Sequence, residues 1–281
     1  MILITGATGT VGREALALLL EGGHKAAAVT RTPDRAALPA GVQLVAGDPS
    51  DPGTLAAALP GVEAILLSPR AVGESTAELL ALAAEHGVRR VVVLSAVTVE
   101  YGGGYQRFAA GFQRVEDAAR ASGLEWTFLR CSDFSANALA WAPQIRAAGT
   151  VRGAYGGAAT SAIHERDIAA VAVRALTDPA AHAGRAYALT GPQSLNQRDK
   201  VRIIGEAVGS EVHWQEVAPE QVRQAMLAQG LGEDVPDRLL GYLAECLQRP
   251  GPTTGTVEQI LGRPALTFAD WAADHANAFR K

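Results

Sequence analysis

The chain has 281 residues, of which 48% are apolar and 19% are charged, and its formal net charge is −4. That length suits one large domain or two small ones, and the acidic balance gives no basic surface for nucleic acid or an anionic membrane. No apolar run approaches the roughly 18 residues of a membrane span, and no export signal is visible. Cys131 and Cys246 are too few for a disulfide framework, and no Cys/His cluster has metal-ligand spacing, so we expect a cytoplasmic protein with reduced thiols and no bound metal.

The first half of the chain alternates apolar strands with amphipathic helices. Strands are predicted at residues 1–5, 25–30, 42–48, 62–68, 88–97 and 125–131. Helices are predicted at residues 11–23, 51–60, 73–87 and 108–123. Asp51 is the expected N-cap of the second helix, because Pro52 follows it at the first helical position. Apolar strands that alternate with helices form a parallel sheet covered on both faces, so the sequence predicts a doubly wound α/β fold.

The second half is less regular and predicts a smaller C-terminal α+β lobe. Its helices are expected at residues 167–176, 196–209, 219–230, 237–248 and 267–281, and its strands at 184–190 and 212–217. The expected N-caps are Asp167, Asn196 and either Thr267 or Asp270. We expect residues 1–155 and 156–281 to form two domains, with 184–190 returning to the main sheet and 159–162 forming an exposed loop.

Residues 5–12, with the sequence TGATGTVG, connect the first predicted strand to the first helix. In a doubly wound sheet this turn binds a pyrophosphate, because the helix N-terminus presents free N–H groups and a partial positive charge. Gly6 allows the tight turn, Gly9 lets the backbone approach the phosphate, and Gly12 lets the helix pack close to the sheet. The alternative is a glycine-rich turn without a ligand. The loop residues expected to contact a dinucleotide are Gly6, Thr8, Gly9, Thr10, Val11 and Gly12.

The end of the second predicted strand discriminates between the two pyridine dinucleotides. Enzymes that use NAD place an acid there to accept a hydrogen bond from the ribose 2′-OH, whereas this chain has Thr30 and Arg31 and no acid before Asp34. A guanidinium pairs with a 2′-phosphate, which an acid would repel. Arg31, assisted by Thr30 or Arg35, therefore favours NADP(H), and the alternative is that Arg31 is a solvated surface charge.

The GxxGxxG spacing of the loop differs from that of the commoner dinucleotide fold and resembles the atypical short-chain dehydrogenase/reductases. Five further stretches resemble the NmrA-like branch of that family, so that the resemblance covers almost the whole chain: 45–68, 123–139, 161–178, 184–209 and 257–279. The resemblance implies an NADP-binding domain at 1–155, a mainly substrate-binding lobe at 156–281, and a place for Asp48 beside the adenine. Ser68 and Pro69 end the fourth predicted strand and are expected to border the nicotinamide ribose.

Most short-chain reductases use a Ser, a Tyr and a Lys, with the Tyr and Lys spaced YxxxK on the helix after the fifth strand. The Tyr donates the proton, and the positive charge of the Lys lowers the pKa of the Tyr. By resemblance, Ser95 occupies the serine position. Counting back from Glu116, Phe108 and Phe112 occupy the Tyr and Lys positions, and the segment 95–125 contains no lysine. The proton relay is therefore missing or rebuilt. The catalytic residue stays open, and the candidates are Ser95, Tyr101, Tyr105 and His164.

Aromatic residues are concentrated between positions 101 and 141, where a substrate would contact the nicotinamide. Rings that line a pocket would stack on a flat aromatic substrate. The alternative is an ordinary core, which we prefer for Trp126 and Phe128. His164 resembles a residue that borders the substrate cleft in the family, but a lone His is more often structural. The expected substrate contacts are Phe108, Phe112, Phe134 and Trp141.

These patterns predict an NADPH-dependent oxidoreductase that reduces a quinone or a conjugated aromatic carbonyl by direct hydride transfer, without a Tyr–Lys dyad. Such an acceptor forms a stabilised anion that can take its proton from water. The alternative is a non-catalytic NADP(H)-binding redox sensor that acts through a protein partner and exposes an apolar patch on its C-terminal lobe. An isomerase or lyase that uses bound nicotinamide is a third option. The expected partners are a small aromatic or quinone-like substrate and, for a homodimer, a second copy of the chain.

Overall fold

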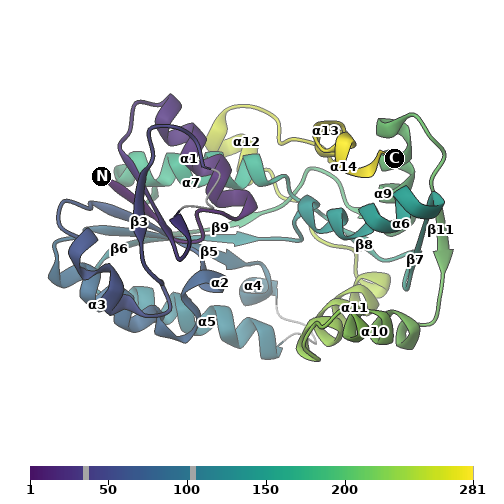
Figure 1. Ribbon diagram of the computed structural model, residues 1–281, viewed down its shortest axis with the longest axis horizontal. Helices are drawn as coiled ribbons and strands as arrows, with labels where there is room; N and C mark the ends of the chain where they lie inside the picture. Colours follow the sequence, from purple (N-terminus) through teal and green to yellow (C-terminus); the bar gives the residue numbers. More distant parts are fainter. Residues whose placement is uncertain (34–37, 102–105, 281) are drawn as a thin grey trace.

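A seven-stranded, wholly parallel sheet forms the centre of the computed structural model, in the order β3-β2-β1-β4-β5-β6-β9 (Figure 1). The structure describes residues 1–33, 38–101 and 106–280, with 106–108 described through their backbone. The strand order reverses between β1 and β4, as it does in a doubly wound sheet. The strands are β1 (Ile2–Ile4), β2 (Ala26–Thr30), β3 (Gln43–Ala46), β4 (Ala64–Leu67), β5 (Arg90–Ala96), β6 (Glu125–Cys131) and β9 (Arg185–Leu189). The predicted fold class is confirmed.

Two helical layers cover the sheet, because successive strand residues point to opposite faces. Ile4 packs into the layer of α1 (Thr10–Glu21), α7 (Glu165–Thr177) and α12 (Thr256–Leu261). Leu3 packs into the opposite layer, with α3 (Thr76–Glu85), α5 (Gln106–Ala121) and the 3₁₀ helix η2 (Pro52–Ala58). Short elements connect these layers: α2 (Pro69–Val72), η3 (Gly73–Ser75), α4 (Thr98–Tyr101) and α8 (Pro179–His182).

Three predictions about helices need correction. The helix predicted at 51–60 is the shorter 3₁₀ helix η2 (Pro52–Ala58) rather than an α-helix, although Asp51 is its N-cap as expected, without a side-chain hydrogen bond. The helix α7 begins at Glu165, and its N-cap is His164 instead of Asp167, because the His164 ring accepts a hydrogen bond from the Arg166 amide. The C-terminal helix is divided at His275 into α13 (Phe268–Asp274) and α14 (Ala276–Phe279).

Other helix ends agree with the sequence. Asn196 caps α9 (Gln197–Val208), with its side chain accepting from the Asp199 amide. Thr267 caps α13 and forms a capping box with Asp270, so both residues proposed for that end contribute.

The C-terminal lobe has its own hydrophobic cluster, in which Trp271 and Phe279 are buried. Its further elements are η4 (Ser135–Trp141), α6 (Ala142–Ala148), β7 (Thr150–Gly153), β8 (Ala159–Thr160), β10 (Leu195–Asn196), β11 (His213–Glu216), α10 (Pro219–Ala228) and α11 (Asp234–Gln248). The expected exposed loop at 159–162 is wrong, because β8 pairs with β10 and Thr160, Ser161 and Ala162 are buried. Residues 138–151 contribute to the hydrophobic cluster of this lobe, so the packing favours a domain boundary earlier than the one expected at residue 155. The division into two domains stays a prediction.

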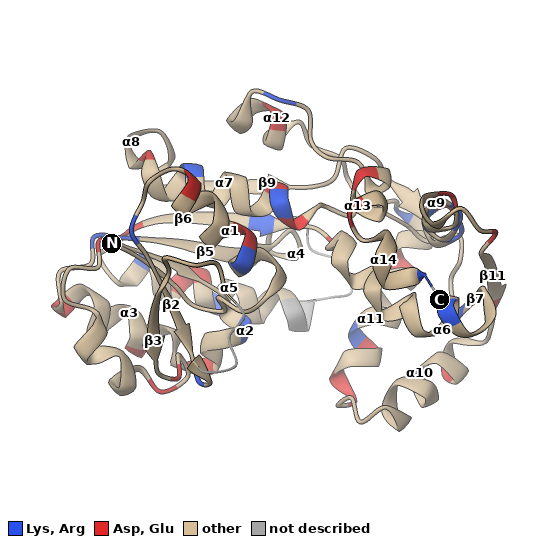
Figure 2. Cartoon of the chain, turned by 45° about the horizontal axis from the view of Figure 1, so that its top comes forward, with Lys and Arg blue, Asp and Glu red and all other residues tan. Residues whose placement is uncertain are grey.

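Acidic and basic residues are interspersed over the helices of both lobes (Figure 2), in agreement with a net charge of only −4. Within residues 1–33, 38–101 and 106–280, no helix combines the length and the apolar character that a membrane crossing requires.

Candidate cofactor and substrate site

The glycine loop ends in an exposed and uncapped helix N-terminus. Gly9 is the N-cap of α1 and makes no side-chain hydrogen bond, and the first turn of the helix carries no acidic residue. The loop is closed by its own backbone, since the Gly9 amide donates to the Gly6 carbonyl at 2.9 Å and the Arg13 amide donates to the Gly9 carbonyl at 3.0 Å. The first-turn N–H groups of α1 are therefore available to an anion.

Two of the three loop glycines, Gly6 and Gly12, occupy positions where a side chain would not fit, and a side chain on Gly9 would be tight. Gly6 has a φ of +67°, and a Cβ there would lie 2.9 Å from the Cβ of Ser68. A Cβ on Gly12 would meet the Gly6 carbonyl oxygen and lie 2.8 Å from Ala7 Cα. A Cβ on Gly9 would lie 3.2 Å from the Gly6 oxygen and would project from an exposed residue. The loop thus offers bare backbone on the side from which a ligand approaches.

Thr5, which the sequence analysis missed, holds the two strands at the switch point together. Its Oγ1 donates to the Leu66 carbonyl at 3.1 Å and accepts from the Ser68 amide at 2.8 Å. The carboxyl ends of β1 and β4 are thereby tied while their loops diverge to α1 and α2, so that Ser68 faces Gly6 across the opening. This is the place where doubly wound sheets bind a dinucleotide.

Arg31 follows the last residue of β2, and its side chain is 77% exposed. Its guanidinium lies 4.0 Å from the Asp48 carboxylate, which follows β3. Hydrogen bonds from the Ser50 hydroxyl and amide, with a smaller contribution from Arg31, hold the pKa of Asp48 below its ordinary value. Thr30 is buried, and its Oγ1 accepts from the Thr32 amide. Arg35 lies outside the described residues.

These observations fit a dinucleotide that carries a 2′-phosphate. The open N-terminus of α1 and the bare backbone of the loop suit the diphosphate. The Arg31 side chain is largely exposed, and its ion pair with Asp48 is long, so the guanidinium can turn toward a phosphate at little cost in free energy. Thr30 has less to offer, because the residue is only 7% exposed.

Ser95 is committed to a buried carboxylate. Its hydroxyl donates to Oε1 of Glu116 at 2.7 Å, and Glu116 is fully buried. The same carboxylate accepts two hydrogen bonds from Arg130, at 2.8 and 3.0 Å, and one from Arg120 at 2.9 Å. Burial alone would raise the pKa of Glu116, but the bonds from Arg130, Ser95 and Arg120 outweigh it and leave the pKa below its ordinary value. Ser95 therefore acts as a donor within the α5 side of the sheet.

We expect Glu116→Gln to lower the free energy of unfolding at pH 7 by about 2 kcal/mol, because it leaves two guanidinium groups around a neutral amide. A depressed folded pKa contributes stability above the unfolded value, which is lost as the pH falls. The difference between the wild type and the variant should therefore shrink between about pH 5 and pH 3. Urea unfolding at a series of pH values measures it, and a difference that stays constant with pH would contradict the ionised state of Glu116.

The loop after β6 is fixed by a second polar cluster that the sequence analysis missed. Lys200 is only 3% exposed, and its Nζ donates to the Asp133 carboxylate at 3.3 Å and to the Thr160 hydroxyl. Thr160 donates in turn to Asp133, and the Asn137 amide donates to the other Asp133 oxygen at 2.6 Å. The only sequence signal is a lysine on the apolar side of α9, beside Val201 and Ile204. The cluster joins the edge of the sheet to the C-terminal lobe.

The described rings of the expected aromatic wall do not contact one another, so the wall stays a prediction. Phe134 packs against the α1 and α7 layer, whereas Trp141 packs edge-on to Trp214 in the C-terminal lobe. Phe112 is half-buried on α5, and among the described side chains it makes no ring contact with Phe134 or Trp141. Tyr101 is 45% exposed at the end of α4. Tyr105 and the Phe108 side chain lie outside the described residues.

Trp126 and Phe128, assigned to the core, stack at 4.3 Å between ring centroids, and Phe128 is fully buried. The Arg120 guanidinium lies over both rings. The same guanidinium donates to Glu116, so Arg120 connects these two rings to the hydrogen-bond network of Ser95.

His164 is buried at the start of α7 and its ring is surrounded by protein. One ring nitrogen, Nδ1, accepts from the Arg166 amide and lies 3.5 Å from Glu165, and Nε2 lies 3.4 Å from Asp274. Glu165 also contacts His275 at 3.0 Å. This position favours a structural role for His164, joining α7 to α13.

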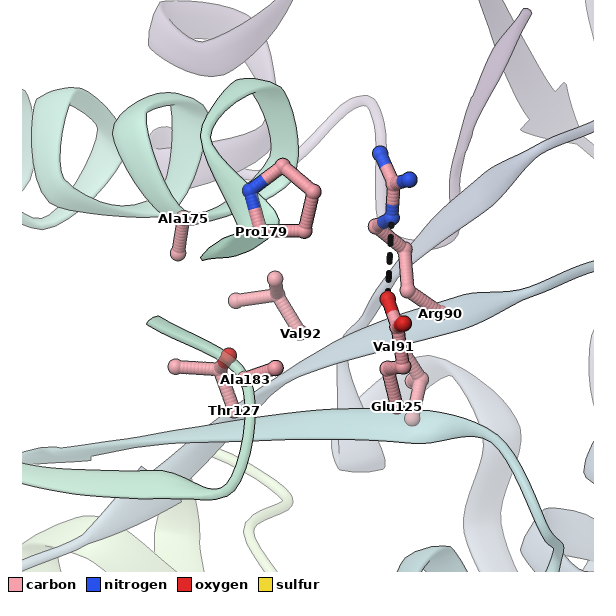
Figure 3. Close-up of a pocket in the computed structure, with 8 residues that line it drawn as sticks. All are labelled: Arg90, Val91, Val92, Glu125, Thr127, Ala175, Pro179 and Ala183. Atoms are coloured by element: carbon pink, nitrogen blue, oxygen red, sulfur yellow. Dashed lines mark ion pairs between the residues drawn. The ribbon is translucent and has the colours of Figure 1, made fainter. Parts of the chain in front are cut away.

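A small cavity lies at the opposite edge of the sheet, at the beginnings of β5 and β6 (Figure 3). Arg90 and Glu125 point toward one another there, with 3.7 Å between Nε and Oε2. The cavity has a volume of about 10 Å³, which holds a single water. It is therefore too small for a substrate and lies on the wrong side of the sheet.

Comparisons with known proteins agree with the geometry of the glycine loop. Residues 6–179 match the family model described as NAD(P)H-binding. The chain is 38% identical to the (4-alkanoyl-5-oxo-2,5-dihydrofuran-3-yl)methyl phosphate reductase of Streptomyces griseus and 36% identical to the NAD(P)H azoreductase of Xenophilus azovorans, with 99% of each chain covered in both cases. It superimposes on the NADPH-dependent quinone oxidoreductase of Escherichia coli in complex with NADPH with a TM-score of 0.81, at 26% identity over 98% of this chain and 99% of that one.

The resemblance stated from the sequence is thus confirmed, and the cofactor is a nicotinamide dinucleotide. The match covers more than half of the chain, and the two relatives extend over nearly all of it. The chain belongs to the NAD(P)H-binding family of atypical short-chain dehydrogenase/reductases and is an NAD(P)H-dependent oxidoreductase.

Proposed function

We propose that the protein is an NADPH-dependent reductase of conjugated carbonyl compounds, quinones among them, which transfers hydride directly to an electron-poor carbon without a Tyr–Lys dyad. The acceptors in the names of its relatives are an unsaturated lactone, an azo compound and a quinone. Each of the three contains a conjugated double bond, which delocalises the negative charge that the acceptor gains when a hydride adds to it. The shared chemistry supports this acceptor class for the present chain.

The Ser95–Glu116 hydrogen bond is the observation that carries the proposal. A ketone reductase needs a hydroxyl and a Tyr–Lys pair to protonate a developing alkoxide. Here the hydroxyl at the serine position donates to Glu116, and the segment 95–125 has no lysine. An acceptor that delocalises its charge does not need that apparatus and takes its proton from water.

The residues of the chain are then responsible for binding and orientation. The N-terminus of α1 holds the diphosphate, and Arg31 pairs with the 2′-phosphate. The dinucleotide supplies the hydride. Thr5 and Ser68 set the opening between β1 and β4, and the loop after β6, fixed by Asp133 and Lys200, closes the side toward the C-terminal lobe. Placing the acceptor against the nicotinamide supplies most of the rate enhancement.

Turnover with defined acceptors tests the proposal. Purified protein is mixed with NADPH and, separately, with a naphthoquinone, an azo dye, an α,β-unsaturated lactone and a simple ketone, and the absorbance at 340 nm is followed. We expect oxidation of NADPH with at least one conjugated acceptor and none with the ketone. Reduction of the ketone at a comparable rate would contradict the acceptor class.

We expect Ser95→Ala to retain kcat/KM within about threefold of the wild type, because the hydroxyl serves Glu116 rather than the substrate. The lost bond to a charged group should lower the free energy of unfolding by about 1.5 kcal/mol. Steady-state kinetics and urea unfolding measure the two effects. A loss of kcat/KM beyond about 100-fold with unchanged stability would instead make Ser95 catalytic.

A second function, the non-catalytic redox sensor, is favoured by one observation. The exposed large apolar side chains of the C-terminal lobe are Leu231, Leu239 and Leu247, and all three lie on or between α10 and α11. An apolar face of this kind suits a protein partner. A sensor would bind NADPH and NADP⁺ with different affinities and oxidise NADPH with none of the four acceptors, so the same assay and a nucleotide titration separate the two functions.

A further inference from the structure

Two hydroxyl groups in the described part of the chain are shielded from solvent and have no hydrogen-bond partner, Thr98 Oγ1 and Ser135 Oγ. The Ser135 residue as a whole is 1% exposed. Folded proteins leave few such groups, because a buried hydroxyl without a partner is destabilising. Where they persist, a ligand that completes them is a physical reason for their retention.

Both residues lie at the end of the sheet formed by the carboxyl ends of its strands, which is the end that carries the glycine loop. Thr98 is the first residue of α4, which follows the carboxyl end of β5, and Ser135 is the first residue of η4, which follows the carboxyl end of β6. The two strands are neighbours, and Ala96 is paired with Cys131. The amide of Val97 donates to the Cys131 carbonyl at 3.0 Å, which keeps the two outgoing segments together. Ligands of doubly wound sheets bind at this edge.

The polar side chains around these two hydroxyls are already engaged. Ser132 donates to the Ser161 carbonyl at 2.6 Å, and Asn137 donates to Asp133 at 2.6 Å. Before Thr98, the Ser95 hydroxyl donates to Glu116. Among the described side chains, two other buried atoms near this end of the sheet lack a hydrogen-bond partner, His164 Nε2 and Glu165 Oε2. Both belong to the charged cluster at the start of α7, where they face Asp274 and His275, so Thr98 and Ser135 are the hydroxyls without any polar neighbour to complete them.

We propose that Thr98 and Ser135 donate hydrogen bonds to a conjugated carbonyl oxygen held at this edge of the sheet. The inference rests on the proposed function and goes beyond it, because it assigns two binding residues. The oxygen belongs either to the acceptor or to the carboxamide of the nicotinamide, which have the same acceptor chemistry. On an acceptor, the hydroxyls would stabilise the negative charge that reaches the oxygen as hydride adds to the conjugated carbon.

The variants Thr98→Val and Ser135→Ala test the role of each hydroxyl with little change in volume. Each should lower either kcat/KM for the acceptor or the affinity for NADPH by roughly tenfold, the effect of one lost hydrogen bond. The melting temperature of the protein without nucleotide should stay the same or rise, because an unpartnered buried hydroxyl is removed. This combination of lost binding and retained stability is not expected of a structural hydroxyl.

Thr127→Val and Ser122→Ala are the matched controls. Thr127 donates to the His182 carbonyl at 2.9 Å and lines the small cavity at the opposite edge of the sheet (Figure 3). Ser122 donates to the Ala119 carbonyl at 2.7 Å, at the far end of α5. Both hydroxyls have partners, so each control should lower the melting temperature and leave kinetics and nucleotide affinity unchanged.

Titrations with NADPH and with adenosine 2′,5′-bisphosphate, which has no nicotinamide, distinguish the two sources of the oxygen. If the hydroxyls bind the carboxamide, the variants weaken NADPH about tenfold and leave the bisphosphate unchanged. If they bind the acceptor, both nucleotides keep their affinities and kcat/KM alone falls. Either result supports the proposal.

Two results would overturn it. One is unchanged kcat/KM together with unchanged NADPH affinity in both variants, and the other is a fall in melting temperature as large as that of the controls. If the wild type oxidises NADPH with no acceptor, the proposed function fails on its own. The nucleotide titrations then decide the present inference: a selective loss of NADPH affinity supports it, and unchanged affinity overturns it.

Discussion

Gly12→Ala is expected to lower the free energy of unfolding by at least about 3 kcal/mol and to abolish the stabilisation of the protein by NADPH. The added Cβ would meet the Gly6 carbonyl oxygen and lie 2.8 Å from Ala7 Cα, and both are backbone atoms of the glycine loop. Neither can rotate away as a flexible side chain would. Either α1 or the loop must move. Because α1 is packed against α7, a shift of α1 would also disturb the hydrophobic core on that face of the sheet. The displacement would separate the first-turn amides from the diphosphate.

Gly111→Ala is the control for this substitution. Gly111 lies within α5, and nothing in the described structure comes within 4 Å of a Cβ at that position. Alanine in a helix is favoured over glycine by roughly 0.5–1 kcal/mol, so this variant should be slightly more stable and bind NADPH normally. Urea unfolding and the NADPH-induced shift in melting temperature measure both variants. A Gly12→Ala protein that binds NADPH within threefold of the wild type would refute the close-packing role of Gly12.

The first half of the fold follows from local patterns in the sequence. The strands that form β1 to β6 are short apolar runs, and the glycine spacing marks the turn between β1 and α1. The short strands β7, β8 and β10 were missed, because two to four residues carry no readable period. They pair through contacts with distant segments, such as Val151 with Trp214.

The start of α7 shows how tertiary contacts override a local signal. Both His164 and Asp167 precede an apolar helical pattern, and Asp is the better N-cap by preference. In the structure the Asp167 carboxylate accepts hydrogen bonds from Arg263 and from the Leu266 amide, both at 2.7 Å. These partners lie 96 and 99 residues away along the chain, so no local pattern could have assigned the aspartate to them.

The candidate site divides in the same way. The diphosphate loop is encoded by neighbouring residues and was predictable. Which polar side chain is engaged depends on partners that are distant in sequence, such as Glu116 for the Ser95 hydroxyl and Lys200 for the Asp133 carboxylate. A serine at a familiar position is therefore a weak guide to catalysis, and Thr98 and Ser135 look ordinary until their surroundings are known.

Arg31→Asp is expected to raise the dissociation constant for NADPH by roughly 100-fold and that for NADH by less than about threefold. The substitution removes the guanidinium proposed to pair with the 2′-phosphate. It also places a carboxylate beside Asp48, whose lowered pKa keeps it ionised at neutral pH. Two negative groups would then face the 2′-phosphate, whereas the ribose 2′-OH of NADH can donate to either of them. The arginine side chain is largely exposed, so the fold should tolerate the change.

Arg31→Gln separates the lost attraction from the added repulsion, and we expect an intermediate loss of about tenfold for NADPH. Arg89→Asp is the control of equal charge change, because Arg89 pairs with Glu63 near the amino ends of β4 and β5, away from the glycine loop. It should leave both nucleotides within about twofold, since screening over such a distance removes most of the effect of a surface charge. Fluorescence titrations with NADPH and NADH measure all three variants at two salt concentrations. Equal losses for both nucleotides in Arg31→Asp would mean that Arg31 does not contact the 2′-phosphate, whereas a selective loss that shrinks in high salt is the signature of a guanidinium–phosphate pair.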